Sequence, residues 1–209
     1  IAGMSWGAGW IDATSGALRH YKREVALRDD DRAAEALRGA TTTTLLVHLR
    51  RPSLLSTLTL ADTQPFLSAE PAFVFAHNGD FDRHDEYRPR YAARGLLRGR
   101  ADTEVGFQYL RELRRDLDPV AALLRLHEDM AGPSNYLYLD VDGLLLAYAA
   151  GEQPIYRFRR GEQTGIATAL YSTDRAIFDL VLSDAEDLGD LPPGRPQALN
   201  EPSASSHQL

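Results

Sequence analysis

The chain has 209 residues and a formal net charge of −7, and 44% of its residues are hydrophobic, which is typical of a globular protein with a sizeable core. It has no basic stripe that would favour nucleic acid, and no apolar run approaches the ~18 residues of a membrane-spanning helix. It contains no cysteine, which excludes disulfides, thiolate metal ligands and a cysteine nucleophile within these residues. We expect no cofactor and, by default, a cytoplasmic location.

The first third of the chain is predicted to be rich in strands. Apolar, β-favouring runs predict strands at 5–11, 43–49 and 72–77. The first run contains Gly7 and Gly9, which permit another backbone to approach closely. Between the first two runs, Asp30 to Leu37 predicts a short helix that is stopped by Gly39.

Two helices are predicted in the middle of the chain. Thr103 to Leu117 has apolar residues recurring every fourth position, with Asp102 as its expected N-cap. Asp118 is expected to cap a second helix, with Pro119 in its first position, and Gly132 ends it.

Strands return after the helices. Further apolar runs predict strands at 135–140, 143–149, 155–159 and 165–171. Asp142-Gly143 predicts a tight hairpin between the first two of these. Strands, then a helix pair, then more strands predict an α+β sandwich. We expect one domain over residues 1–189 and a disordered tail over residues 190–209, which are rich in Pro, Ser, Gln and Asn.

The stretch His77-Asn78-Gly79 ends an apolar strand and has two interpretations. Asn-Gly is a strong signal for a hairpin turn. Alternatively, the Asn78 side-chain amide and the Gly79 backbone N–H could bind a developing negative charge at the end of the strand. The stretch by itself does not decide between a turn and such an oxyanion hole.

Two further positions are candidates for contacts with a charged ligand. Arg50 follows an apolar strand, and the planar fork of arginine suits a carboxylate, although a basic pair at a strand end is also common on surfaces. Asp102 begins a helix, where it could accept hydrogen bonds from a substrate ammonium or simply cap the helix.

Two acidic clusters favour structural interpretations. Oxygen and imidazole groups at Asp80, Asp82, His84 and Asp85 could meet one ion, but acidic loops are usually solvated, and we predict no metal site. The pair of aspartates in residues 140–143 is similar to that of some phosphotransferases, but a strand follows it without a phosphate-binding helix, which favours a hairpin.

Five motifs occur together in a specific order. They are Trp6-Gly7-Ala8-Gly9-Trp10, His48-Leu49-Arg50-Arg51-Pro52-Ser53, Asp62-Thr63-Gln64-Pro65-Phe66, Phe75-Ala76-His77-Asn78-Gly79 and Ala101-Asp102-Thr103-Glu104. In this order they resemble the class II glutamine amidotransferases, in particular the small stand-alone bacterial members, over about residues 4 to 175. The resemblance implies an N-terminal-nucleophile hydrolase fold, a four-layer αββα sandwich, and hydrolysis of the amide of glutamine or of a γ-glutamyl compound.

The resemblance also implies roles for individual residues. Asn78 and Gly79 would form the oxyanion hole, preceded by His77 as a structural support. Arg50 would bind the α-carboxylate of the substrate, and Asp102 would accept from its α-ammonium. Ser53 stands where the family usually has a threonine that helps the carboxylate contact.

The sequence departs from the family pattern at the nucleophile. The family uses a cysteine at the mature N-terminus, with its own α-amine as the base, and Ile1 cannot supply this chemistry. We expect that cysteine to lie on a segment preceding this chain. The alternative is a catalytically inactive protein that binds glutamine or γ-glutamyl compounds. Ammonia would pass to a separate synthase polypeptide in one version of the reaction, and a homodimer is a further option.

Overall fold

The computed structural model describes residues 4–38, 41–168, 180 and 182–200. Its first sheet contains β1 (Ser5–Ile11), β2 (Leu18–Arg23) and β3 (Leu45–Arg50) in the antiparallel order β2-β1-β3. The outer face of β1 carries Trp6, Ala8 and Trp10, which pack against Ala33 of helix α1 (Ala33–Arg38). The predicted strands at 5–11 and 43–49 are therefore confirmed, whereas β2 was not predicted.

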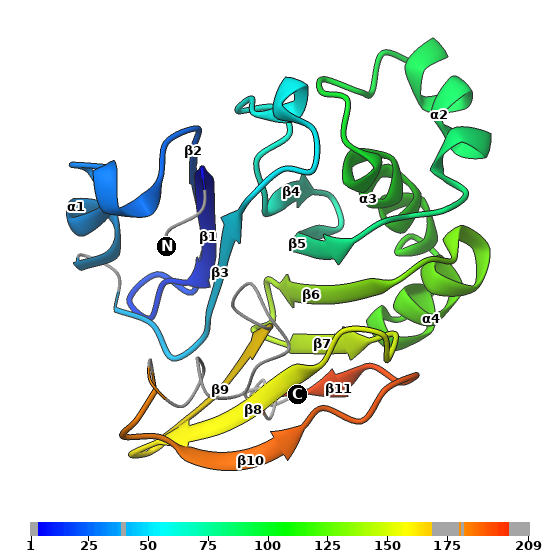
Figure 1. Ribbon diagram of the computed structural model, residues 1–209. Helices are drawn as coiled ribbons and strands as arrows, with labels where there is room; N and C mark the ends of the chain where they lie inside the picture. The colour runs from blue at the N-terminus through cyan, green and yellow to red at the C-terminus, as the bar shows by residue number, and fades with distance from the viewer. Residues whose placement is uncertain (1–3, 39–40, 169–179, 181, 201–209) are drawn as a thin grey trace, which may run out of the picture.

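The second sheet forms the centre of the molecule (Figure 1). Its strand order is β11-β7-β6-β5-β4, with every neighbouring pair antiparallel. The strands are β4 (Phe66–Ala69), β5 (Ala72–Gly79), β6 (Ser134–Asp140), β7 (Leu145–Ala149) and β11 (Gln197–Ala198). Helices α2 (His84–Ala93), α3 (Asp102–Leu113) and α4 (Pro119–Met130) cover one face and bury the largest apolar cluster.

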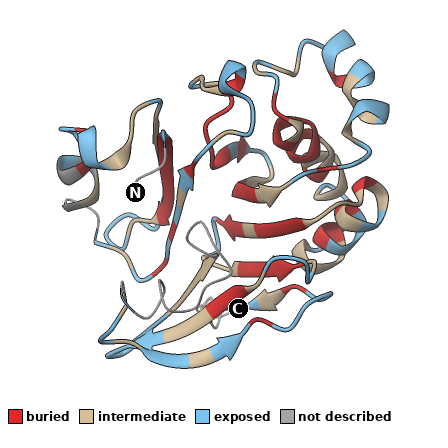
Figure 2. Cartoon of the chain, viewed as in Figure 1, coloured by how far each residue is buried: buried red, intermediate tan, exposed pale blue. Residues whose placement is uncertain are grey.

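The two sheets pack through alternate residues of β5. Phe73 and Phe75 face the helices, whereas Val74 and Ala76 face Leu46 of β3 in the first sheet. The layers are therefore α1, the first sheet, the second sheet and the helices α2–α4, as the αββα expectation requires (Figure 2 shows the buried residues concentrated between them).

The predicted close approach at the β1 glycines is confirmed. A Cβ at Gly7 would overlap the carbonyl oxygen of Gln64, and a Cβ at Gly9 would lie 2.6 Å from the Val74 side chain. Neither position has room for a side chain, so these glycines allow the two sheets to meet.

A third sheet has the order β10-β8-β9, made by β8 (Ile155–Arg160), β9 (Gln163–Thr168) and β10 (Glu186–Asp190). β8 and β9 agree with the strands expected at 155–159 and 165–171, except that residues 169–171 lie outside the described residues.

The expectation of disorder from residue 190 onward is wrong for the described part of that segment. Leu191 is buried and packs in a cluster with Ala147 and Ile155, and β11 pairs with β7. The Asn200 side chain also donates to the carbonyl of Gly143 at 2.6 Å. Residues 201–209 lie outside the described residues.

The helix predictions hold in outline and differ at the ends. Asp118 caps α4 by accepting from Ala121 N at 3.0 Å, and Pro119 is its first residue, as expected. By contrast, α3 begins at Asp102 itself and ends at Leu113, and the Asp102 carboxylate accepts from Phe81 N instead of capping its own helix. Two 3-10 turns, η1 (Leu27–Asp29) and η2 (Leu55–Thr57), complete the described elements.

Candidate active site

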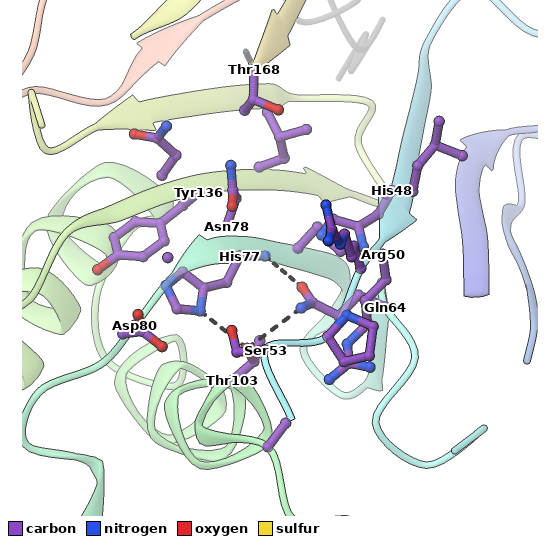
Figure 3. Close-up of a pocket in the computed structure, with 18 of the residues that line it drawn as sticks. His48, Arg50, Ser53, Gln64, His77, Asn78, Asp80, Thr103, Tyr136 and Thr168 are labelled. Carbon is purple, nitrogen blue, oxygen red and sulfur yellow. Dashed lines mark hydrogen bonds between the residues drawn. The ribbon is translucent and has the colours of Figure 1, made fainter. Parts of the chain in front are cut away.

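A cavity of about 700 Å³ opens where the three sheets meet. The end of β3, the end of β5, the start of α3 and part of β9 all contribute to its lining. It contains all of the site residues predicted from the sequence, which are Arg50, Ser53, His77, Asn78, Gly79 and Asp102. Figure 3 shows Arg50 on β3, Ser53 in the segment after it, and His77 and Asn78 on β5.

Asn78 and Gly79 belong to a strand and do not form a hairpin turn. β5 continues through Gly79, and Asn78 pairs with Asn135 while Gly79 pairs with Ser134 of β6. Asn78 follows Val74 and Ala76 in the alternation of β5, so its side chain lies on the face between the sheets, in the cavity. The turn interpretation of this stretch is therefore wrong.

The direction of the Gly79 N–H follows from its neighbours. His77 N donates to Gln64 Oε1 at 2.6 Å, on the edge of β5 that faces away from β6. Because N–H groups two residues apart on a strand point to the same edge, Gly79 N–H also faces that edge, where the cavity lies. Gly79 has φ = +129°, and a Cβ there would overlap the carbonyl oxygen of Pro133. Glycine is thus required at this position.

His77 lies beneath this strand end as a buried, neutral ring. Its Nδ1 is 3.1 Å from Thr103 Oγ1, its Nε2 is 3.1 Å from Ser134 Oγ, and it stacks on Phe81. Burial lowers the pKa of His77 to about 4, and the Asp102 carboxylate opposes this shift. Both ring nitrogens are occupied by hydroxyl groups, an arrangement that suits a support and leaves no nitrogen facing a substrate.

Arg50 is buried at the end of β3 and held in one orientation. Its Nη1 donates to Thr57 O at 2.8 Å and its Nη2 donates to Thr57 Oγ1 at 2.7 Å. Burial lowers the pKa of Arg50, and Asp62 and Asp102 raise it. The guanidinium nevertheless keeps its charge near neutral pH, and it has further N–H groups besides the two bound to Thr57. Ser53 lies three residues further along, exposed at the cavity.

The loop that leads to Asp102 is held by two buried carboxylates, Asp62 and Glu104, which were not predicted as site residues. Asp62 Oδ1 accepts from the backbone N–H groups of Arg100 and Ala101, both at 2.7 Å. Glu104 accepts from the two preceding N–H groups of the same loop, both at 2.8 Å. The loop before Asp102 is therefore held by four charge-assisted hydrogen bonds. Asp62 lies in one of the five motifs, which was the available signal.

Two more polar partners of the site were not predicted: Gln64 lies within one of the five motifs, whereas Gln153 lies outside all of them. Gln64 bridges β5 and α3, since its Oε1 accepts from His77 N while its Nε2 lies 3.4 Å from Thr103 Oγ1 (Figure 3). Gln153, in the connection between β7 and β8, accepts from Asn78 Nδ2 at 3.4 Å.

The acidic clusters take structural positions. Asp80 and His84 line the cavity, but Asp85 is 83% exposed, and within the described ranges no three acidic or histidine side chains gather as a metal site would need. Asp140 Oδ1 accepts from the backbone N–H groups of Asp142 and Leu144, which makes the predicted tight turn between β6 and β7. Within the described segments, no helix is long and apolar enough to cross a membrane.

Comparison with known proteins identifies this arrangement. The model of a family described as class II glutamine amidotransferases matches residues 2–160. No curated protein sequence matches the chain. Among solved structures, the glutamine phosphoribosylpyrophosphate amidotransferase of B. subtilis, complexed with ADP and GMP, superposes with a TM-score of 0.65 at 17% identity, covering 94% of this chain and 43% of that one.

Two other solved structures give similar results. One is described as the allosteric regulatory enzyme of purine biosynthesis, with a TM-score of 0.69 and 16% identity over 95% of this chain and 43% of that chain. The other is a glutamine aminotransferase class-II domain protein from Silicibacter pomeroyi, with a TM-score of 0.62 and 17% identity over 94% of this chain and 87% of that one. The chain thus spans less than half the length of the first two structures.

The fold is the α+β sandwich of the N-terminal-nucleophile hydrolase type. The chain belongs to the class II glutamine amidotransferase family, as the order of its five motifs predicted.

Proposed function

We propose that this protein is an amidohydrolase of the glutamine amidotransferase type that cleaves the side-chain amide of glutamine or of a γ-glutamyl compound. One observation carries the proposal: the Asn78 amide and the Gly79 N–H face the same cavity as Arg50 and Asp102. A zwitterionic amino acid needs a cation and an anion to hold its two charged groups, and a reacting amide needs donors for its oxygen.

In this proposal Arg50 binds the α-carboxylate, with Ser53 beside it, and Asp102 accepts from the α-ammonium. The side-chain carbonyl then lies against Asn78 and Gly79, whose N–H groups stabilise the tetrahedral oxyanion. His77 positions the strand that carries both donors and takes no part in proton transfer. A neutral, doubly hydrogen-bonded His77 supports this division of roles.

The nucleophile in this proposal is an N-terminal cysteine on a segment preceding Ile1, as in the family pattern. Its α-amine, with a pKa of about 7.7–8.0, accepts the thiol proton, the thiolate attacks the amide carbon, and ammonia or an amine leaves. Water then hydrolyses the thioester. Residues of β3 and β9 line the cavity, and each of these strands lies at the edge of its three-stranded sheet. An edge strand has unpaired backbone groups with which a further segment can pair, and this supports the placement.

The experiment that tests the proposal uses the protein with its natural N-terminus. We expect it to release ammonia from L-glutamine or an amine from a γ-glutamyl compound. Replacing Asn78 with Ala is expected to lower kcat about 10²–10³-fold with little change in KM. Protein that carries the N-terminal cysteine and turns over neither class of substrate would refute the proposal.

The second candidate is an inactive module that binds glutamine or γ-glutamyl compounds, favoured by the lack of any cysteine in these residues. It predicts binding of L-glutamine that depends on Arg50, with no product from any form of the protein. The codons upstream of Ile1 distinguish the candidates, because only the first requires a cysteine there. An ammonia-accepting synthase partner belongs to the proposal only if the first candidate holds, whereas a homodimer is compatible with either candidate.

A further inference from the structure

Gln153 contacts the proposed oxyanion donor from outside the five motifs. It lies in the connection between β7 and β8 and lines the cavity. Its Oε1 accepts from Asn78 Nδ2 at 3.4 Å.

The backbone around Gln153 is held in place on both sides. Asn135 Nδ2 donates to the carbonyl oxygen of Gln153 at 3.1 Å. The segment that follows β10 supports the same connection, since Gly194 N donates to Ala149 O at 2.8 Å and Leu191 N donates to Ile155 O at 2.8 Å. The backbone of Gln153 is therefore held in place, while its side chain is exposed at the cavity.

The orientation of the Asn78 amide decides whether this residue can stabilise an anion. A carboxamide has two N–H groups at one end and a carbonyl oxygen at the other. If the amide turned by half a rotation, its oxygen would face the developing negative charge and repel it. In the orientation that the structure shows, Gln153 Oε1 accepts from one N–H of Asn78 and leaves the second N–H for the substrate.

We propose that Gln153 is a positioning residue for the oxyanion hole: its side-chain carbonyl fixes the Asn78 amide with an N–H directed into the cavity. This inference rests on the proposed function. Gln153 acts through Asn78 alone, so it affects the transition state, in which the oxyanion exists, more than the binding of substrate.

The test is a double-mutant cycle in the protein with its natural N-terminus. Gln153→Met removes the acceptor at similar volume, and Glu152→Gln, an exposed neighbour in the same connection, is the matched control. We expect Gln153→Met to lower kcat about 3–10-fold, the value of one hydrogen bond, with KM for L-glutamine and the melting temperature unchanged. In an Asn78→Ala background the same substitution is expected to have no further effect.

Two results would overturn the inference. One is an unchanged kcat in Gln153→Met, and the other is an equal loss of kcat in the wild-type and Asn78→Ala backgrounds, which would show an effect not transmitted by Asn78. If the wild-type protein shows no turnover, the proposed function fails, and NMR of the 209-residue chain decides about Gln153 separately. There we expect Gln153→Met to shift the Asn78 side-chain N–H resonances, and unchanged resonances would refute the contact.

Discussion

Arg50 offers the sharpest test of how the cavity recognises its ligand. Its guanidinium is oriented by two hydrogen bonds to Thr57, and it lines the same cavity as Asp102. A hydrogen bond to a charged group contributes about 1.5–3 kcal/mol. Arg50→Ala should therefore weaken binding of L-glutamate or L-glutamine about 10–150-fold, by the conversion of about 1.4 kcal/mol per factor of ten.

The assay is isothermal titration calorimetry on the 209-residue chain, which needs no nucleophile. Thr57→Val is the matched control, because it removes the contact at Nη2 and keeps both the charge and the contact at Thr57 O. We expect that control to weaken binding by no more than about tenfold, because the bond it removes orients Arg50 and does not itself contact the ligand.

The ligand supplies the decisive comparison. 4-Aminobutanamide has the amide and the ammonium of glutamine but lacks the α-carboxylate. If Arg50 binds that carboxylate, this compound binds weakly to the wild type and Arg50→Ala weakens it little further. Equal weakening of both ligands by Arg50→Ala would refute the reasoning and assign Arg50 a role in holding the fold.

Three further predictions concern stability. Gly79→Ala should lower the free energy of unfolding by more than about 1–3 kcal/mol, since the backbone has φ = +129° and a Cβ would overlap the carbonyl of Pro133; an unchanged melting temperature would contradict this. Burial lowers the pKa of His77 to about 4, below the unfolded value of about 6.5, so stability is fully present above pH 6.5 and falls by up to about 1.4 kcal/mol per pH unit toward pH 4. Burial also lowers the pKa of His48 to about 4, so His48 contributes in the same direction. The difference in the free energy of unfolding between pH 7 and pH 5, measured with urea, should therefore be smaller in His77→Gln than in the wild type, but not zero. An equal difference in the two proteins would contradict the assignment to His77. Leu191→Ala should cost about 2–5 kcal/mol in urea unfolding because the side chain is 3% exposed, and a cost near zero would support the original expectation of a disordered tail.

Secondary structure was predictable where local patterns were strong. The β-favouring runs of β1, β3, β5 and β6 and the capped α4 agree with the structure, because each carries its signal in adjacent residues. α2 was missed because its sequence is strongly polar and contains Pro89, so it shows no apolar stripe, although Tyr91 is fully buried against α3. β11 was missed for a similar reason, since two residues that pair with β7 carry no periodic pattern.

The sequence alone determined the family and named six residues that line the cavity, because the order of short motifs along a chain needs no coordinates to be recognised. Only the tertiary structure decided what those residues do locally. Asn78-Gly79 has the local signature of a turn, yet pairing with β6 keeps it extended and directs its polar groups into the cavity. Asp102 has the signature of a helix cap, yet it accepts from Phe81, a partner 21 residues away along the chain. Side-chain direction and hydrogen-bond partners depend on segments distant in sequence, and folding alone brings those segments together.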